Sequence, residues 1–222
     1  MLKKPKLTAM DNDKMKSIEE YIDFLEESFK DGGQNLPEKE IVSDYKQKVE
    51  SVSYSLYIDR ADLHYFISRQ LFLVHIDLYS YFAGHQCIEN YLKAYIKYKN
   101  SIPKDIHILE KLLENCRQLD IDKNDNFIHS ARITTIIKFY EPFYELARYP
   151  VQKVRPNKGQ YVSVFPDGIN ILDLFVFRMR EIIKLPENSR DLFKDNHYHL
   201  DLCQMKDSSF YNKFKKDNIN FQ

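Results

Sequence analysis

Residues 84–95 read Gly-His-Gln-Cys-Ile-Glu-Asn-Tyr-Leu-Lys-Ala-Tyr, and this stretch decides how the rest of the chain is interpreted. Its apolar residues recur at helical spacing, while Gln86, Glu89 and Lys93 follow one another at intervals of three and four residues. The pattern predicts a helix that packs a core on one side. Its other side offers amide, carboxylate and ammonium groups, which indicates an interaction surface.

The composition is typical of a globular, helix-rich protein. Of 222 residues, 43% are apolar and 30% are charged, and the chain has only 5 Gly and 8 Pro. Lysine plus arginine and aspartate plus glutamate balance at 33 each. Because the net charge is zero, indiscriminate binding to a phosphate backbone is not expected. Binding of nucleic acid must therefore be argued from a local site.

The sequence predicts neither a signal peptide nor a membrane span. The basic start, Met1 to Lys6, leads into polar residues, and the apolar stretch 71–83 is short and interrupted by His75, Asp77 and Ser80. We expect a soluble, cytoplasmic protein.

The cysteines are expected to be reduced thiols without a disulfide. Cys87, Cys116 and Cys203 form no close pair, and the first two fall on apolar helix faces.

The N-terminal part predicts a helical extension over residues 1–57. Ser17 and Glu20 form a capping box, and helical spacing follows to about Lys30. Two glycines and a proline within 31–37 end that helix, and residues 38–57 predict another.

Residues 58–185 predict an all-α, up-and-down helical bundle. Two long antiparallel helices are expected between 59 and 100, with a break at 75–78. Asp105 is placed to cap a third helix, and a fourth is bent or restarted at Pro142. A small β-hairpin is expected at 154–165, and Gly168 opens a fifth helix. Residues 186–222 form a C-terminal extension.

Three separate stretches carry a resemblance to a known family. The first consists of Phe82, Ala83, Gln86, Glu89, Leu92, Lys93 and Ala94. The second consists of Pro103, Lys104, His107, Leu112 and Leu113, and the third of Arg148, Tyr149 and Pro150. On these residues the chain resembles the HEPN family, the nucleotide-binding domain of higher eukaryotes and prokaryotes. The resemblance runs from about Ile58 to Pro150 and more loosely to Lys184.

The resemblance implies a four- or five-helix bundle, commonly a homodimer, in which a cleft binds nucleotide or RNA. It also implies a bacterial toxin–antitoxin or phage-defence setting, where a nucleotidyltransferase-like protein is a possible cognate partner. In the ribonuclease branch of the family, an Arg and a His separated by four to six residues cleave RNA without metal. The imidazole moves the 2′-hydroxyl proton, and the guanidinium stabilises the phosphate charge.

Two pairs in the sequence have that Arg–His separation, and neither is a strong match. Arg69 and His75 lie in one helical stretch, about 120° apart around the axis. Arg190 and His197 follow the bundle and are the weak catalytic candidates. Arg148 occupies the usual place of the family's arginine, but no His follows it.

The expected function is therefore a nucleotide-, RNA- or partner-binding module that lacks the ribonuclease pair. Its expected binding residues are Gln86, Glu89, Lys93, His107 and Arg148. Two alternatives remain: an endoribonuclease toxin that uses Arg190 and His197, and a purely structural dimerisation module. Structural roles also compete at individual residues, since Glu89 and Lys93 can form an ordinary i,i+4 ion pair and Arg148 can close a helix end. No cofactor or metal is expected, because only one group of potential metal ligands, at 197–203, occurs in the sequence.

Overall fold

The computed structural model divides into two compact units, Met1–Glu50 and Ser51–Gln222. The structure describes residues 51–148, 168–187, 189–194, 208–216 and 218–221, all of which belong to the second unit. These residues form helices, and no strand occurs among them. The predicted all-α class is confirmed. The expected helix at 17–30, the hairpin at 154–165, His197 and Cys203 lie outside the described residues.

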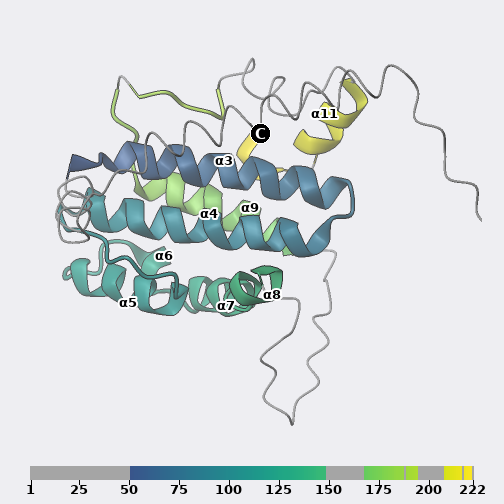
Figure 1. Cartoon of the computed structure of the whole chain (residues 1–222). Coiled ribbons are helices and arrows are strands. Elements are labelled where there is room, and N and C mark those ends of the chain that lie inside the picture. The colour runs from purple at the N-terminus through teal and green to yellow at the C-terminus, as the bar shows by residue number, and fades with distance from the viewer. Residues whose placement is uncertain (1–50, 149–167, 188, 195–207, 217, 222) are drawn as a thin grey trace, which may run out of the picture. The chain divides into compact units, whose positions relative to one another are not determined.

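The described helices are arranged as Figure 1 shows. They are α3 (Tyr54–Leu73), α4 (Asp77–Tyr98), α5 (Leu109–Leu119), α6 (Asn126–His129), α7 (Ala131–Tyr140), α8 (Phe143–Arg148), α9 (Gly168–Ile182), α11 (Ser208–Lys215) and the 3-10 helix η1 (Ile219–Phe221). α3 and α4 lie side by side and antiparallel. α5, α7 and α8 flank α4, and α9 packs against both long helices.

The α3–α4 hairpin is the scaffold of the bundle, and the predicted break between its helices is confirmed. α3 begins after Ser53, whose hydroxyl accepts a hydrogen bond from the amide of Ser55. It ends before His75, which lies in the turn with φ 59°. The expectation that His75 shares a helix with Arg69 is therefore wrong. Near this end the hydroxyls of Ser68 and Ser80 donate to each other's backbone carbonyls at 2.9 and 2.8 Å.

The core between the helices is rich in tyrosine. Tyr65, Tyr81, Tyr91, Tyr95 and Tyr140 are fully buried. Their rings pack at distances typical of aromatic pairs, as between Tyr81 and Tyr140, whose centroids are 5.9 Å apart. Core packing thus accounts for these five of the chain's 16 tyrosines. Cys87 and Cys116 are buried among these residues.

The start of α5 differs from the prediction. The N-cap position is Ile108, and Asp105 does not cap the helix. The side chain of Glu141 takes this role instead, because its carboxylate accepts from the amides of Leu109 and Glu110 at 2.9 and 3.3 Å. An acceptor from the α7–α8 junction thus satisfies amides that a helix leaves unpaired at its first turn.

The two later helix boundaries agree with the prediction. α7 ends at Tyr140 and α8 begins at Phe143, so Pro142 separates them. α9 begins at Gly168, and its buried residues Leu172, Phe175 and Met179 follow the expected spacing.

The described residues after α9 also contribute to the core. Leu192 and Phe214 are buried, and the Arg69 guanidinium donates to the carbonyl of Phe214 at 3.1 Å. Arg69 also forms a buried ion pair with Asp173 of α9. Boundaries of the bundle at residues 57 and 185 stay a prediction.

Within the described residues, no helix is both long enough and apolar enough to cross a membrane.

The close approach of α4 to α7 predicts that Gly84→Ala destabilises the bundle. A Cβ at Gly84 would lie 2.4 Å from a ring carbon of Tyr140, and that ring is fully buried, with its hydroxyl bonded to the carbonyl of Gly168 at 3.0 Å. Alanine favours a helix over glycine by about 1 kcal/mol, but overpacking costs about 1–3 kcal/mol. Because the approach is so close and the Tyr140 ring is fully buried, the overpacking cost should lie in the upper part of this range. We therefore expect a net loss of about 1–2 kcal/mol in the free energy of urea unfolding. The exposed Lys138→Ala is the control, and equal stability of Gly84→Ala and wild type would contradict the packing argument.

Candidate functional site: a buried carboxylate beneath an exposed histidine

The polar side chains of α4 converge on the carboxylate of Glu89. Lys93 Nζ lies 2.8 Å from Oε1, and Gln86 Nε2 donates to Oε2 at 3.3 Å. From the segment before α5, His107 Nδ1 approaches the two oxygens at 3.0 and 3.2 Å. Four of the five expected binding residues therefore meet in one place.

This polar group does not face solvent directly, contrary to the interaction surface expected for α4. Glu89 is only 4% exposed, and the side chain of Lys93 is 11% exposed. The segment between α4 and α5 places His107 against the carboxylate. A buried carboxylate is costly unless it is paired, and here a cation and two hydrogen-bonding groups surround it.

His107 connects the buried carboxylate to the surface. Its Nδ1 faces Glu89, so in the neutral imidazole this nitrogen carries the hydrogen and Nε2 is the acceptor. Nε2 has no hydrogen-bond partner among the described residues, and the side chain is 47% exposed. The carboxylate thus orients a ring whose second nitrogen is open to a ligand.

Tyr144 of α8 lies between His107 and Arg148, which is the fifth expected binding residue. The rings of His107 and Tyr144 stack with centroids 5.0 Å apart and an angle of 15° between their planes. The Arg148 guanidinium lies 4.8 Å from the Tyr144 centroid and donates to the tyrosine hydroxyl. We call Gln86, Glu89, Lys93, His107, Tyr144 and Arg148 the Glu89 cluster.

Tyr144 is the member that sequence reasoning missed as a site residue. In the sequence it follows Tyr140 at helical spacing, which is typical of a core position, but its side chain is only partly buried. The one signal in the sequence is its position four residues before Arg148, which allows the two side chains to meet on a helix.

His85 lies beneath the same tyrosine ring and is a core residue. It is fully buried, and its ring centroid lies 5.2 Å from that of Tyr144. Burial lowers its pKa to about 4, although the nearby Glu89 acts in the opposite direction. Its Nε2 has no hydrogen-bond partner. The imidazole is therefore neutral at physiological pH.

The other candidates lie elsewhere. Arg69 is buried against Asp173 and belongs to the core. Arg190 is exposed after α9, where it lowers the pKa of Asp59 against the larger effect of burial. Its partner in the catalytic alternative, His197, lies outside the described residues. Among the side chains that the structure describes, no group of three His, Cys, Asp or Glu is arranged to hold a metal ion.

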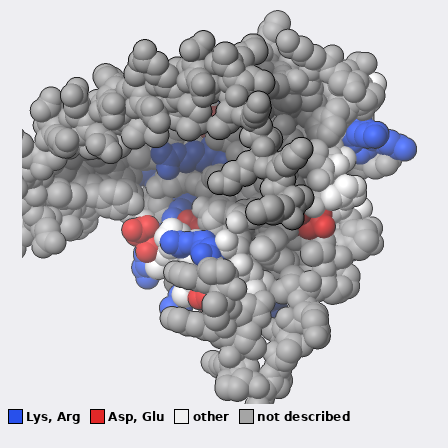
Figure 2. All heavy atoms as spheres, turned by 45° about the vertical axis from the view of Figure 1, so that its right-hand side comes forward, with Lys and Arg blue, Asp and Glu red and all other residues white. Residues whose placement is uncertain are grey.

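The surface charges are mixed in sign. In Figure 2, Lys and Arg side chains alternate with Asp and Glu side chains over the described part of one face. This agrees with the zero net charge of the chain.

A family model, the HEPN domain, matches residues 54–175, which is more than half of the chain. The chain belongs to the HEPN family. The matched region of this HEPN protein includes every member of the Glu89 cluster, and it ends within α9. No curated protein and no solved structure gave a significant match.

The buried His85 predicts a loss of stability in acid. The unfolded chain takes up a proton on this histidine near pH 6.5, whereas the folded chain does so only near pH 4. Stability should therefore rise with pH between about 4 and 6.5, and this residue contributes about 3 kcal/mol above that window.

The measurement is urea unfolding at several pH values in wild type and in His85→Phe, which keeps an aromatic ring but cannot titrate. We expect a shallower dependence of the unfolding free energy on pH in the variant. The same slope in both proteins between pH 4 and 6.5 would contradict a neutral buried His85.

Proposed function

We propose that this HEPN protein binds a nucleotide or RNA on the surface formed by His107, Tyr144 and Arg148. The observation that carries the proposal is the meeting of three distant stretches of sequence. His107 joins the α4 residues at the Glu89 carboxylate, and Tyr144 with Arg148 packs against the His107 ring. The proposed surface combines an oriented imidazole, an aromatic ring and a guanidinium within a few ångströms of one another.

These groups suit the two parts of a nucleotide. A guanidinium binds phosphate oxygens through paired N–H donors. Imidazole and phenol rings stack on bases, and such stacking contributes about 1–3 kcal/mol per base. The partly exposed ring of His107 extends the stack begun by Tyr144 toward solvent.

Within this proposal the buried members of the Glu89 cluster position the binding groups. Lys93 is held by Glu89 and is largely buried, so it neutralises the carboxylate and does not contact the ligand. The side-chain amide of Gln86 donates a hydrogen bond to the second oxygen of the Glu89 carboxylate. Glu89 then holds His107 in one orientation and one tautomer.

The proposal includes loss of the family's ribonuclease pair, because no His follows Arg148 within the required spacing. It also includes a homodimer in a toxin–antitoxin or phage-defence system, with a nucleotidyltransferase-like protein as cognate partner. The family resemblance supports this context, and a defence or nucleotidyltransferase gene next to this one would strengthen it.

Endoribonuclease activity is the second candidate, and one observation favours it. A histidine whose Nδ1 is held by a carboxylate and whose Nε2 is open has the arrangement of a general base. Arg190 with His197 is the other catalytic alternative.

Arg148→Ala should weaken the binding of a labelled single-stranded RNA by about tenfold, equivalent to about 1.4 kcal/mol, as measured by fluorescence anisotropy at low salt. Arg178→Ala is the matched control, since Arg178 is also exposed on a helix, also lies near an aromatic ring and also has a short polar contact. Tyr144→Ala and Glu89→Gln should weaken binding too. An equal loss in both arginine variants, or no loss in Tyr144→Ala, would reject this surface as the binding site.

Incubation of RNA with the protein in EDTA separates binding from cleavage. We expect intact RNA. Cleavage that disappears in His107→Ala would establish the Glu89–His107 pair as catalytic, and cleavage that disappears only in His197→Ala would favour the alternative pair.

A further inference from the structure

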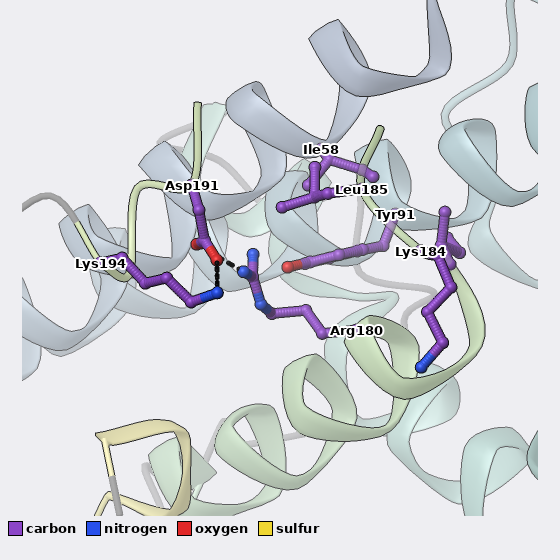
Figure 3. A pocket seen from close by; sticks show the side chains of 8 residues that line it. Ile58, Tyr91, Arg180, Lys184, Leu185, Asp191 and Lys194 are labelled. Atoms are coloured by element: carbon purple, nitrogen blue, oxygen red, sulfur yellow. Dashed lines mark hydrogen bonds and ion pairs between the residues drawn. The ribbon is translucent and has the colours of Figure 1, made fainter. Parts of the chain in front are cut away.

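A cavity of about 200 Å³ lies between α3, α4, α9 and the segment that follows α9, away from the Glu89 cluster (Figure 3). No residue of that cluster lines it. Its lining residues are Ile58, Tyr91, Arg180, Ile183, Lys184, Leu185, Asp191 and Lys194.

The centre of one wall is Arg180, which joins two acidic residues. Its Nη1 lies 2.6 Å from Asp62 Oδ2, and its Nη2 lies 2.6 Å from Asp191 Oδ1. Asp62 is buried behind the cavity and also accepts a hydrogen bond from the Tyr91 hydroxyl. The guanidinium carries more N–H groups than these two bonds use, so donors remain for a ligand.

Two lysines add positive charge at the rim. Lys194 lies 3.5 Å from Asp191, and its side chain is 86% exposed. Lys184 is exposed and has no ion-pair partner among the described residues. Its backbone is held in place by the Tyr54 hydroxyl, which donates to the Lys184 carbonyl at 3.2 Å.

The charges around the cavity do not balance. Arg180, Lys184 and Lys194 are cationic, whereas Asp191 is the one acidic residue in the lining. Asp62, which pairs with Arg180 from outside the lining, brings the acidic residues to two against three cations. The cavity is therefore net positive. Ile58 and Leu185 form an apolar wall of the cavity, and Ile183 is a third apolar lining residue.

We propose that this cavity binds a small phosphate monoester, with the phosphate on Arg180 and Lys194 and the organic group against Ile58 and Leu185. An anionic group matches this excess of positive charge, and a phosphate offers three strong acceptor oxygens, more than a carboxylate does. The volume is below the roughly 300–1,000 Å³ of sites for drug-sized ligands, so the ligand is compact. This site is independent of the proposed RNA-binding surface.

Isothermal titration with propyl phosphate tests the proposal at low ionic strength, where charge interactions are least screened. We expect saturable binding that is at least several times tighter than that of inorganic phosphate, because only the ester contacts the apolar lining. Propanol, which lacks the charge, should not bind.

Lys194→Gln should weaken propyl phosphate binding by about fivefold or more, since it removes one of the two cations that hold the phosphate. Lys111→Gln is the control, because Lys111 is equally exposed on α5 and far from the lining residues in sequence and element. Circular dichroism checks that both variants fold. Absence of saturable heat, equal affinity for inorganic phosphate, or equal weakening in both variants would overturn the proposal.

Discussion

The bundle depends on the pairing of carboxylates that its helices bury. Asp62 on α3, Glu89 on α4 and Asp173 on α9 are each less than 5% exposed. An unpaired carboxylate in such a place costs several kcal/mol, so the fold is stable only where a donor meets each one. Arg180 and Arg69 provide this for the two aspartates, and both bonds join α3 to α9. The ion pairs thus restrict how these helices can slide against each other.

The need to pair each buried carboxylate also explains where the two candidate sites lie. Each site lies where a buried carboxylate is neutralised by groups that also reach the surface. At the Glu89 cluster, the histidine that covers the carboxylate presents its other nitrogen to solvent. At the cavity beside α9, the guanidinium that covers Asp62 also lines an open space. The side chains that pair with the buried carboxylates can therefore also contact ligands.

Local signals in the sequence predicted the helices well and the contacts between them less well. The turn at His75, the break at Pro142 and the opening of α9 at Gly168 all follow from residues near the boundary itself. The start of α5 did not follow this rule, because its acceptor is Glu141, which lies 32 residues further along the chain than Leu109. Tyr144 was missed for the same reason. Its stacking partner, His107, comes from the segment before α5, and no spacing rule connects the two.

The sequence by itself determined the helical class, the family and the residues Gln86, Glu89, Lys93, His107 and Arg148 as a set. Helical periodicity and the family pattern depend on the order of residues, so both can be read along the chain. Only the tertiary structure decided that the α4 stripe is buried and that His107 covers it. It also decided that Arg180 joins two aspartates that are 129 residues apart. These facts depend on which helix faces pack together, and packing is set by the whole core at once.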